Sequence, residues 1–198
     1  IQYFYADKDI VFNGNRLSKF RPGLYGVDTS SGFTLVDSGG TIVRRARRDT
    51  PAQEPDAIVA ATVELIDELG AAARAEGVEA PKVGVACAGY IDKQGANVLF
   101  APNIAWRHEP LRARLEEATG HAVVIENDAN AAAYGEFLHG GGADVDDMVM
   151  VTLGTGVGGG IVLDGELMRG SHGIAAEIGH MRVVPGGHLC GCGNRGCF

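Results

Sequence analysis

The clearest pattern along the chain is a helical stripe over residues 51–76, where Ile58, Leu65 and Leu69 recur at helical spacing. Acidic side chains occupy another face of the same stretch, as in a helix that rests one side on a core. Gly77 follows directly and is a residue type that commonly ends helices. We therefore predict an amphipathic helix over residues 51–76.

Short apolar runs before and after this helix predict strands. Residues 24–28 (LYGVD), 32–37 (GFTLVD) and 41–50 (TIVRRARRDT) are separated by turn residues and predict an antiparallel meander. Residues 82–90 (KVGVACAGY) form one continuous apolar run of strand length. A helix between strands implies a crossover and a mixed sheet, so the pattern indicates the α/β class. Residues 1–22 show neither alternation nor a helical stripe and predict no regular element.

The second half of the chain alternates helices and strands after a loop over residues 96–110. The pattern predicts, in order, a helix over 110–119, a strand over 121–126, a helix over 128–138, a strand over 148–153, a returning strand over 161–163 and a short helix over 174–178. Pro110 at the start and Gly120 just past the end support the first of these helices. Asp164 and Gly165 predict a hairpin turn.

Polar side chains stand at the carboxyl end of the strand over 121–126, where ligands bind in open α/β sheets. Asp128 could accept a proton from a sugar-like hydroxyl beside the amide of Asn127, and such general-base help is worth about 10²–10⁴ in rate. A helix cap is the other interpretation of Asp128, and both roles can hold at once. Glu177 and His180 are three apart and share one side of a helix or its end, although a surface position is the alternative for Glu177.

Three cysteines and a histidine lie close together near the end of the chain. His180, Cys190, Cys192 and Cys197 make a complete tetrahedral set of zinc ligands, with turn-forming residues between the last two. Such a site can contribute on the order of 10 kcal/mol of folding free energy. A pair of disulfides is the alternative, but disulfides belong to oxidising compartments and the chain shows no secretory leader. Cys87 lies in an apolar run and is expected in the core.

A glycine run interrupts the strands of the second half. Gly154, Gly156 and Gly159 match G-x-G-x-x-G, but a dinucleotide fingerprint opens a helix, whereas residues 161–165 continue as strand and hairpin. We interpret the run as a hairpin whose backbone N–H groups hold phosphate, with the hydroxyl of Thr155 added. A purely structural glycine turn remains the alternative.

Composition narrows the class of protein. The chain has 198 residues, 45% hydrophobic, with 30 glycines, which indicates a globular protein of one full domain and part of a second. A net charge of −8 argues against a nucleic-acid surface, although residues 44–48 (RRARR) are a local basic run. No apolar run reaches the roughly 20 residues that a membrane span needs. We expect a cytoplasmic protein without nucleic-acid or membrane partners.

Four motifs resemble the ROK family of repressors, open reading frames and kinases, and especially its bacterial glucokinases: IENDANAAAYGE, VTLGTGVGGGIVLDGEL, EIGHMRVVPGG and CGCGNRGC. The likeness runs from about residue 24 to residue 197. It implies an actin-like ATPase fold (ribonuclease H-like) with two α/β domains, here residues 24–138 and the start of the second at 139–198, after an extension at 1–23. It also implies a homo-oligomer in full-length form and a place in glycolysis.

The resemblance also implies residue roles. Asp128 would deprotonate the 6-hydroxyl of glucose, and ATP with Mg²⁺ would supply the phosphoryl group. The implied ligands of the sugar hydroxyls are Asn103, Asn127, Glu177 and His180. The implied phosphate hairpin comprises Gly154, Thr155, Gly156, Gly158 and Gly159, and the implied structural zinc ligands are His180, Cys190, Cys192 and Cys197.

Two features depart from the family pattern. The first phosphate motif of the family reads like D-I-G-G-T-K, but here Asp28 runs into TSSGF without the glycine pair and the lysine. We still expect Asp28 to bind Mg²⁺ through water. Family members also continue past the last cysteine with a Glu that holds the sugar and with the adenosine pocket, whereas this sequence runs from Ile1 to Phe198. We therefore expect a truncated chain that does not catalyse transfer by itself, because orientation of ATP is a large share of phosphoryl-transfer catalysis.

The resulting hypothesis is a glucokinase-type phosphotransferase. The alternatives are a ROK-type regulator or sugar-binding module that senses sugar, and a zinc-stabilised fragment without activity. A repressor would be marked by an amino-terminal helix-turn-helix, and residues 1–22 show no such helical pair. Polyphosphate as donor, and mannose or N-acetylmannosamine as acceptor, stay open within the kinase hypothesis.

Overall fold

A computed structural model describes most of the chain, over residues 2–6, 30–36, 42–49, 53–75, 77, 82–101, 104–153 and 156–198. The strand expected over 24–28 lies outside the described residues. Among the described helices, none combines the length and the apolar character that a membrane crossing requires.

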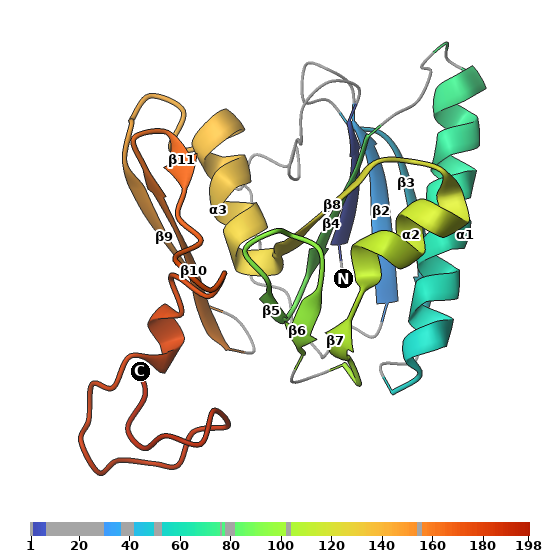
Figure 1. Ribbon diagram of the computed structural model, residues 1–198. Coiled ribbons are helices and arrows are strands. Elements are labelled where there is room, and N and C mark those ends of the chain that lie inside the picture. The colour runs from blue at the N-terminus through green and yellow to red at the C-terminus, as the bar shows by residue number, and fades with distance from the viewer. Residues whose placement is uncertain are drawn as a thin grey trace.

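The main sheet has five strands in the order β3-β2-β1-β4-β8 (Figure 1). Its strands are β1 (Gln2–Ala6), β2 (Ser30–Val36), β3 (Ile42–Asp49), β4 (Lys82–Cys87) and β8 (Val123–Asn127). Strand β1 is parallel to β2 and antiparallel to β4, while β2 and β3 are antiparallel and β4 and β8 are parallel. The expected mixed sheet is confirmed, and so is the antiparallel pairing of the two described strands of the meander.

Strand β1 corrects the expectation that residues 1–22 contain no regular element. Gln2–Ala6 lies in the centre of the sheet and pairs along its whole length with both neighbours. Three aromatic residues in its sequence QYFYA favour a strand. The pattern missed it because pairing with strands about thirty and eighty positions away is not visible in a local window.

Two helices cover one face of this sheet, α1 (Pro55–Ala75) and α2 (Leu111–Thr119) (Figure 1). The predicted stripe of α1 is confirmed, since Ile58, Leu65 and Leu69 are fully or almost fully buried in one core cluster. That cluster also contains Phe33, Val85, Trp106, Leu111, Leu115 and Ile125, together with the expected core residue Cys87. Burying each such side chain contributes about 1.5–3 kcal/mol to the stability of this core.

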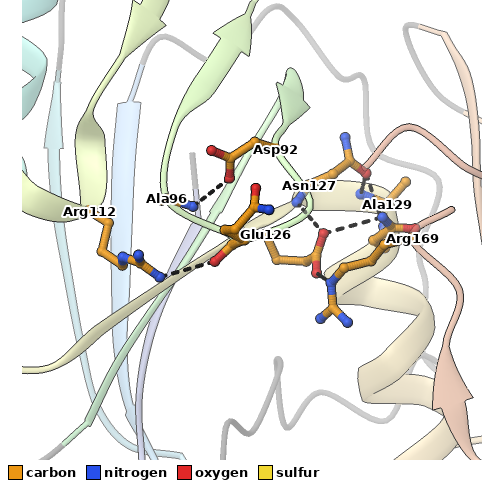
Figure 2. Close-up of polar contacts among 9 residues, drawn as sticks. Asp92, Ala96, Arg112, Glu126, Asn127, Ala129 and Arg169 are labelled. Carbon is orange, nitrogen blue, oxygen red and sulfur yellow. Dashed lines mark hydrogen bonds and ion pairs between the residues drawn. The ribbon is translucent and has the colours of Figure 1, made fainter. Parts of the chain in front are cut away.

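A small three-stranded sheet replaces the loop expected over residues 96–110. Its strands are β5 (Tyr90–Ile91), β6 (Val98–Phe100) and β7 (Arg107–Glu109), in the order β5-β6-β7. The Oδ1 of Asp92 accepts a hydrogen bond from the backbone N–H of Ala96 at 2.8 Å and so holds the first hairpin (Figure 2). Burial alone would raise the pKa of Asp92. Hydrogen bonds from Ala96 and Asn97 outweigh this effect and lower the pKa below its usual value. The prediction failed because strands of two and three residues carry no measurable period.

The remaining elements form a second layer around α3 (Asp128–His139), which lies between the main sheet and a third sheet (Figure 1). That sheet comprises β9 (Met148–Leu153), β10 (Val157–Leu163) and β11 (Glu166–Leu167), all antiparallel. A Cβ at Gly160 would collide with Ala133 of α3, so glycine permits this close packing. The predicted hairpin turn is confirmed, because Asp164 and Gly165 both have positive φ, 50° and 77°.

The short helix expected over 174–178 is wrong in position. The structure has instead a 3-10 helix, η2 (Ile178–His180). Ala176 has φ of 63°, which is left-handed and incompatible with a helix through that residue. The turn therefore begins after it and includes His180.

Candidate functional site

Asn127 ends β8 and caps α3. Its Oδ1 accepts hydrogen bonds from the backbone N–H groups of Ala129 and Asn130 at 2.9 and 3.0 Å. Its Nδ2 donates to the carbonyl oxygen of Gly89 at 3.1 Å. The cap is thus Asn127 rather than Asp128, and only the second hydrogen of its Nδ2 is left for a ligand among the described contacts.

Asp128 is the first residue of α3, and its side chain is exposed. A carboxylate at a helix N-terminus is favoured by the helix dipole. Its Oδ1 also accepts the N–H of Ala129 at 3.0 Å, and no hydrogen bond to its Oδ2 is found among the described residues. The structure therefore presents Asp128 as an accessible carboxylate at the carboxyl end of a buried strand, as the sequence predicted.

A polar cluster around the buried Glu126, two residues before Asp128, was not predicted from the sequence (Figure 2). Glu126 is only 3% exposed, and its Oε2 lies 2.7 Å from Nε of Arg169. Its Oε1 accepts the backbone N–H of Asn127 at 2.9 Å and Nδ2 of Asn130 at 3.2 Å. The available signal was a charged residue inside the apolar run HAVVIE, because a buried carboxylate requires a partner.

Glu177 and His180 flank η2, at the residue that precedes it and at its last residue. The Oε2 of Glu177 lies 4.0 Å from Nε2 of His180. Burial raises the pKa of Glu177, with the charge of His180 opposing the shift and that of Asp128 adding to it. The charge of Asp128 thus contributes to the raised pKa of Glu177, and a common site for the two carboxylates stays a prediction.

Tyr90 of β5 is a further neighbour of this site that the sequence did not single out. Burial raises the pKa of Tyr90, and the negative charges of Glu177, Cys192 and Cys190 raise it further. Its ring lies 6.0 Å from that of Phe100, so the side chain has an aromatic neighbour in the small sheet. Nothing in the local sequence marked it, because its proximity to Glu177 depends on elements far along the chain.

The proposed metal ligands also come together. The ligand atoms of His180, Cys190, Cys192 and Cys197 all lie within 4.8 Å of one another. Tetrahedral zinc, with bonds of about 2.3 Å to sulfur and about 2.0–2.1 Å to nitrogen, separates two sulfurs by about 3.8 Å and sulfur from nitrogen by about 3.6 Å. The Sγ atoms of Cys192 and Cys197 are 3.7 Å apart, and Nδ1 of His180 is 3.5 Å from Sγ of Cys190. This donor set therefore fits a zinc ion.

The cysteines are all free thiols, so the structure does not support the disulfide alternative. A hydrogen bond from the backbone of Asn194 lowers the pKa of Cys192 to about 7, which favours the thiolate that metals bind. Loss of hydration, together with hydrogen bonds to Cys192 and Cys190, raises the pKa of Cys197 to about 11. Because His180 directs Nδ1 at Cys190 and Nε2 at Glu177, one imidazole can serve a metal and a second ligand.

The glycine hairpin has mixed roles. Strand β10 continues directly after it, so the dinucleotide fingerprint is absent from this segment, as expected. A Cβ at Gly158 would meet Thr152 Oγ1 at 2.8 Å, and one at Gly159 would meet Met150 O at 2.9 Å. Gly156 has nothing within 4 Å of such a Cβ and faces open space. Packing thus explains two of these glycines, and a phosphate role stays a prediction.

Four of the predicted site residues, Asp28, Asn103, Gly154 and Thr155, lie outside the described residues. Nη1 of Arg107 donates hydrogen bonds to the carbonyl oxygens of Ala101 at 3.0 Å and Trp106 at 2.7 Å. The guanidinium of Arg107 also lies over the ring of Phe100, 4.0 Å from its centroid.

Comparisons with known proteins agree with this arrangement. The ROK family profile matches residues 25–198. A glucokinase from Streptomyces coelicolor is 48% identical over 164 residues, which cover 83% of this chain and 50% of that protein. The crystal structure of a ROK family glucokinase from Streptomyces griseus, in complex with glucose and AMPPNP, is 49% identical with a TM-score of 0.70, covering 82% of this chain and 50% of that one.

A regulator is similar as well. The structure of a ROK family transcriptional regulator, a homologue of the E. coli MLC protein, is 30% identical with a TM-score of 0.76, over 86% of this chain and 43% of that one. This chain spans about half the length of the curated glucokinases that it matches. The expected actin-like ATPase fold is confirmed by these structural neighbours.

Proposed function

Since this chain belongs to the ROK family, we propose that it serves glucokinase chemistry, the transfer of the γ-phosphoryl group of ATP to the 6-hydroxyl of glucose. One observation carries the proposal: the exposed carboxylate of Asp128 stands at the start of α3, at the carboxyl end of β8. A base at the carboxyl end of a strand, where ligands bind in open α/β sheets, fits a reaction that removes a proton from a sugar hydroxyl.

Within this proposal, Asp128 accepts the proton of the 6-hydroxyl as the phosphoryl group is transferred. Glu177 accepts hydrogen bonds from sugar hydroxyls, and Nε2 of His180 orients one of them. Asn127 can only donate, through its remaining Nδ2 hydrogen, because its oxygen is used by the backbone of α3. Asn103 completes the set as a predicted ligand.

The nucleotide side of the site stays a prediction. A Cβ at Gly156 would have nothing within 4 Å, so space is open beside this residue, and Gly154, Thr155, Gly156, Gly158 and Gly159 are the residues proposed to hold phosphate. Mg²⁺ accompanies ATP in such transfers, and Asp28 is the residue proposed to hold it through water. The sequence after Asp28 lacks the glycine pair and the lysine of the family, which weakens the phosphate contact there.

We also propose that His180, Cys190, Cys192 and Cys197 bind a structural zinc ion, because their donor spacings match a tetrahedral site. All four ligands come from protein, so no open position remains for substrate and the ion would stabilise the fold. Cysteines outside disulfides persist in reducing compartments, which supports the proposal of a cytoplasmic location.

The remaining parts of the proposal concern organisation. Residues 24–138 and 139–198 are proposed as the first domain and the start of the second, after the segment 1–23. The homo-oligomer is proposed for a chain of full family length. Sugar sensing without transfer is the second candidate function, because a family regulator of 30% identity has the same fold.

Asp128→Asn tests the proposed function in a family-length context, with this chain joined to the second half of the Streptomyces coelicolor glucokinase. We expect glucose binding to be retained, measured by calorimetry, and turnover to fall about 10²–10⁴-fold because the proton acceptor is lost. Asp144→Asn, at an exposed position outside the site, is the control and should leave both unchanged.

Unchanged turnover in Asp128→Asn would contradict the role of the base. Glucose binding without any turnover in the parent protein would favour the sensing function. Absence of both binding and turnover would contradict the whole proposal.

A further inference from the structure

The polar cluster around Glu126 joins two segments that are far apart in the sequence. Glu126 belongs to β8, which delivers Asn127 and Asp128, whereas Arg169 follows β11, 43 positions later. The two side chains meet at 2.7 Å, with the carboxylate buried and the arginine 40% exposed (Figure 2). Among the described ion pairs, this one connects the strand of the proposed base to the segment that leads to Glu177.

Both oxygens of Glu126 are used. One accepts the N–H of Asn127 and the amide of Asn130, and the other accepts Arg169. The carboxylate therefore fixes the backbone immediately before Asp128 as well as the first turn of α3. A charged group this deeply buried is tolerated because every one of these partners is in place.

The backbone of Arg169 is also held in place within its own segment. Its carbonyl oxygen accepts the backbone N–H of Ala175 at 3.2 Å, which closes the turn that precedes Glu177 and His180. Within that turn, a Cβ at Gly173 would collide with the carbonyl oxygen of Ile91, so the backbone passes directly over β5. The position of Arg169 thus sets the start of a short, tightly packed path to η2.

We propose that Glu126 and Arg169 are positioning residues: their ion pair sets the distance between Asp128 and the Glu177–His180 segment. Neither side chain needs to touch substrate. The consequence for catalysis rests on the proposed function, but the link between the two segments is a property of the structure alone. Precise placement of a base relative to its substrate's ligands is a large part of the rate that enzymes achieve.

Hydrogen exchange in this chain without sugar tests the link directly. Arg169→Met keeps the length of the side chain and removes its charge, so we expect amides 175–181 and the capped amides of Ala129 and Asn130 to exchange about tenfold faster. Arg169→Lys retains a cation that reaches Glu126 and should restore most of the protection. In Glu126→Gln/Arg169→Met, exchange should be no faster than in Arg169→Met alone, since both changes break the same pair.

Arg114→Met is the matched control. Arg114 is 34% exposed, close to the exposure of Arg169, and its place is in α2, far along the chain from Glu177. It pairs with Glu109 of β7 at 2.7 Å and with Asp56 of α1 at 2.8 Å. We expect it to leave amides 175–181 unchanged. Equal exchange of these amides in Arg169→Met and the parent chain would overturn the proposal, and so would equal acceleration by Arg114→Met, which would indicate general destabilisation.

Glucose titration by calorimetry forms the second arm. If the parent chain binds glucose, Arg169→Met should weaken binding about tenfold and Arg169→Lys by less than about threefold. Binding in the parent with unchanged affinity in Arg169→Met would overturn the positioning role. No binding in the parent would count against the proposed function, while the exchange result would still decide whether the pair links the two segments.

Discussion

The main sheet and the cysteine segment, defined as residues 181–198, keep their shape by different means. The main sheet with α1 and α2 contains a continuous core of fully buried apolar side chains. Over residues 168–198, all described, only Gly173, Gly179 and Gly196 are buried. Met181, Val183, Val184, Leu189 and Phe198 are all exposed there. An apolar core therefore accounts for the first region and cannot account for the second.

Backbone hydrogen bonds and the ligand cluster take the place of a core in the cysteine segment. The N–H groups of Val183 and Val184 donate to the carbonyl oxygen of Gly196, and Phe198 donates to Met181 at 3.0 Å. A Cβ at Gly196 would collide with the carbonyl oxygen of Val184, so only glycine fits this crossing. Exposed hydrogen bonds of this kind contribute little individually, which is why metal binding matters here.

The largest expected effect comes from removing one proposed metal ligand, because the two regions should then respond differently. Cys192→Ser is expected to lose the metal and with it most of a contribution on the order of 10 kcal/mol, so that residues 181–198 lose their order while the main sheet stays folded. Metal content by mass spectrometry and hydrogen exchange at Val183 and Phe198 measure this. Cys87→Ala removes a thiol from the core and should retain the metal. Unchanged metal content in Cys192→Ser would contradict the zinc assignment.

A cavity in the core should destabilise the main sheet and leave the metal site of the cysteine segment intact. Leu65 of α1 is completely buried, and Leu65→Ala is expected to lower the free energy of unfolding by about 2–5 kcal/mol, as measured by urea denaturation. Metal content of the folded protein should stay the same. Glu64→Ala, at the neighbouring exposed position, is the control and should change stability by less than about 0.5 kcal/mol. A loss of metal in Leu65→Ala would show that the two regions are not separable.

The smallest expected effect is a pH dependence confined to the main sheet. Burial lowers the pKa of His121, with Arg74 lowering it further and Asp67 opposing the shift. The unfolded chain therefore binds this proton more tightly, and stability falls as the pH drops through the ordinary histidine range towards the lowered pKa. His121→Gln should flatten the curve of unfolding free energy against pH between about 7 and 5. His188→Gln, in the cysteine segment, provides the comparison, and an identical curve in His121→Gln and the parent would contradict the prediction.

Elements whose hydrophobic residues recur with a local period could be predicted from the sequence. Spacing within a short window predicted helix α1, strand β8, helix α3 and the antiparallel return from β9 to β10. The proposed metal ligands were equally accessible, because Cys190, Cys192 and Cys197 lie within eight positions and His180 only ten before them. In each case the interacting residues are close along the chain.

Contacts between distant residues could not be predicted. The central place of Gln2–Ala6 and the Glu126–Arg169 pair depend on segments that meet only after folding. The sheet β5–β7 was missed for a different reason, because its strands are too short to show a period. The same is true of the glycine hairpin, where packing against Met150 and α3 accounts for glycines that the sequence assigned to phosphate.

The sequence by itself determined the α/β class, the family resemblance, the candidate base Asp128 and the ligand set of the proposed metal site, because each rests on residues that lie near one another in the chain. Only the tertiary structure showed that Asn127 is the cap of α3 and that the two ring nitrogens of His180 lie near Cys190 and Glu177. It also showed that the buried carboxylate of Glu126 pairs with Arg169, in the segment that leads to Glu177. The first two depend on side-chain directions that the local sequence leaves open, and the third depends on burial that distant elements impose when they pack.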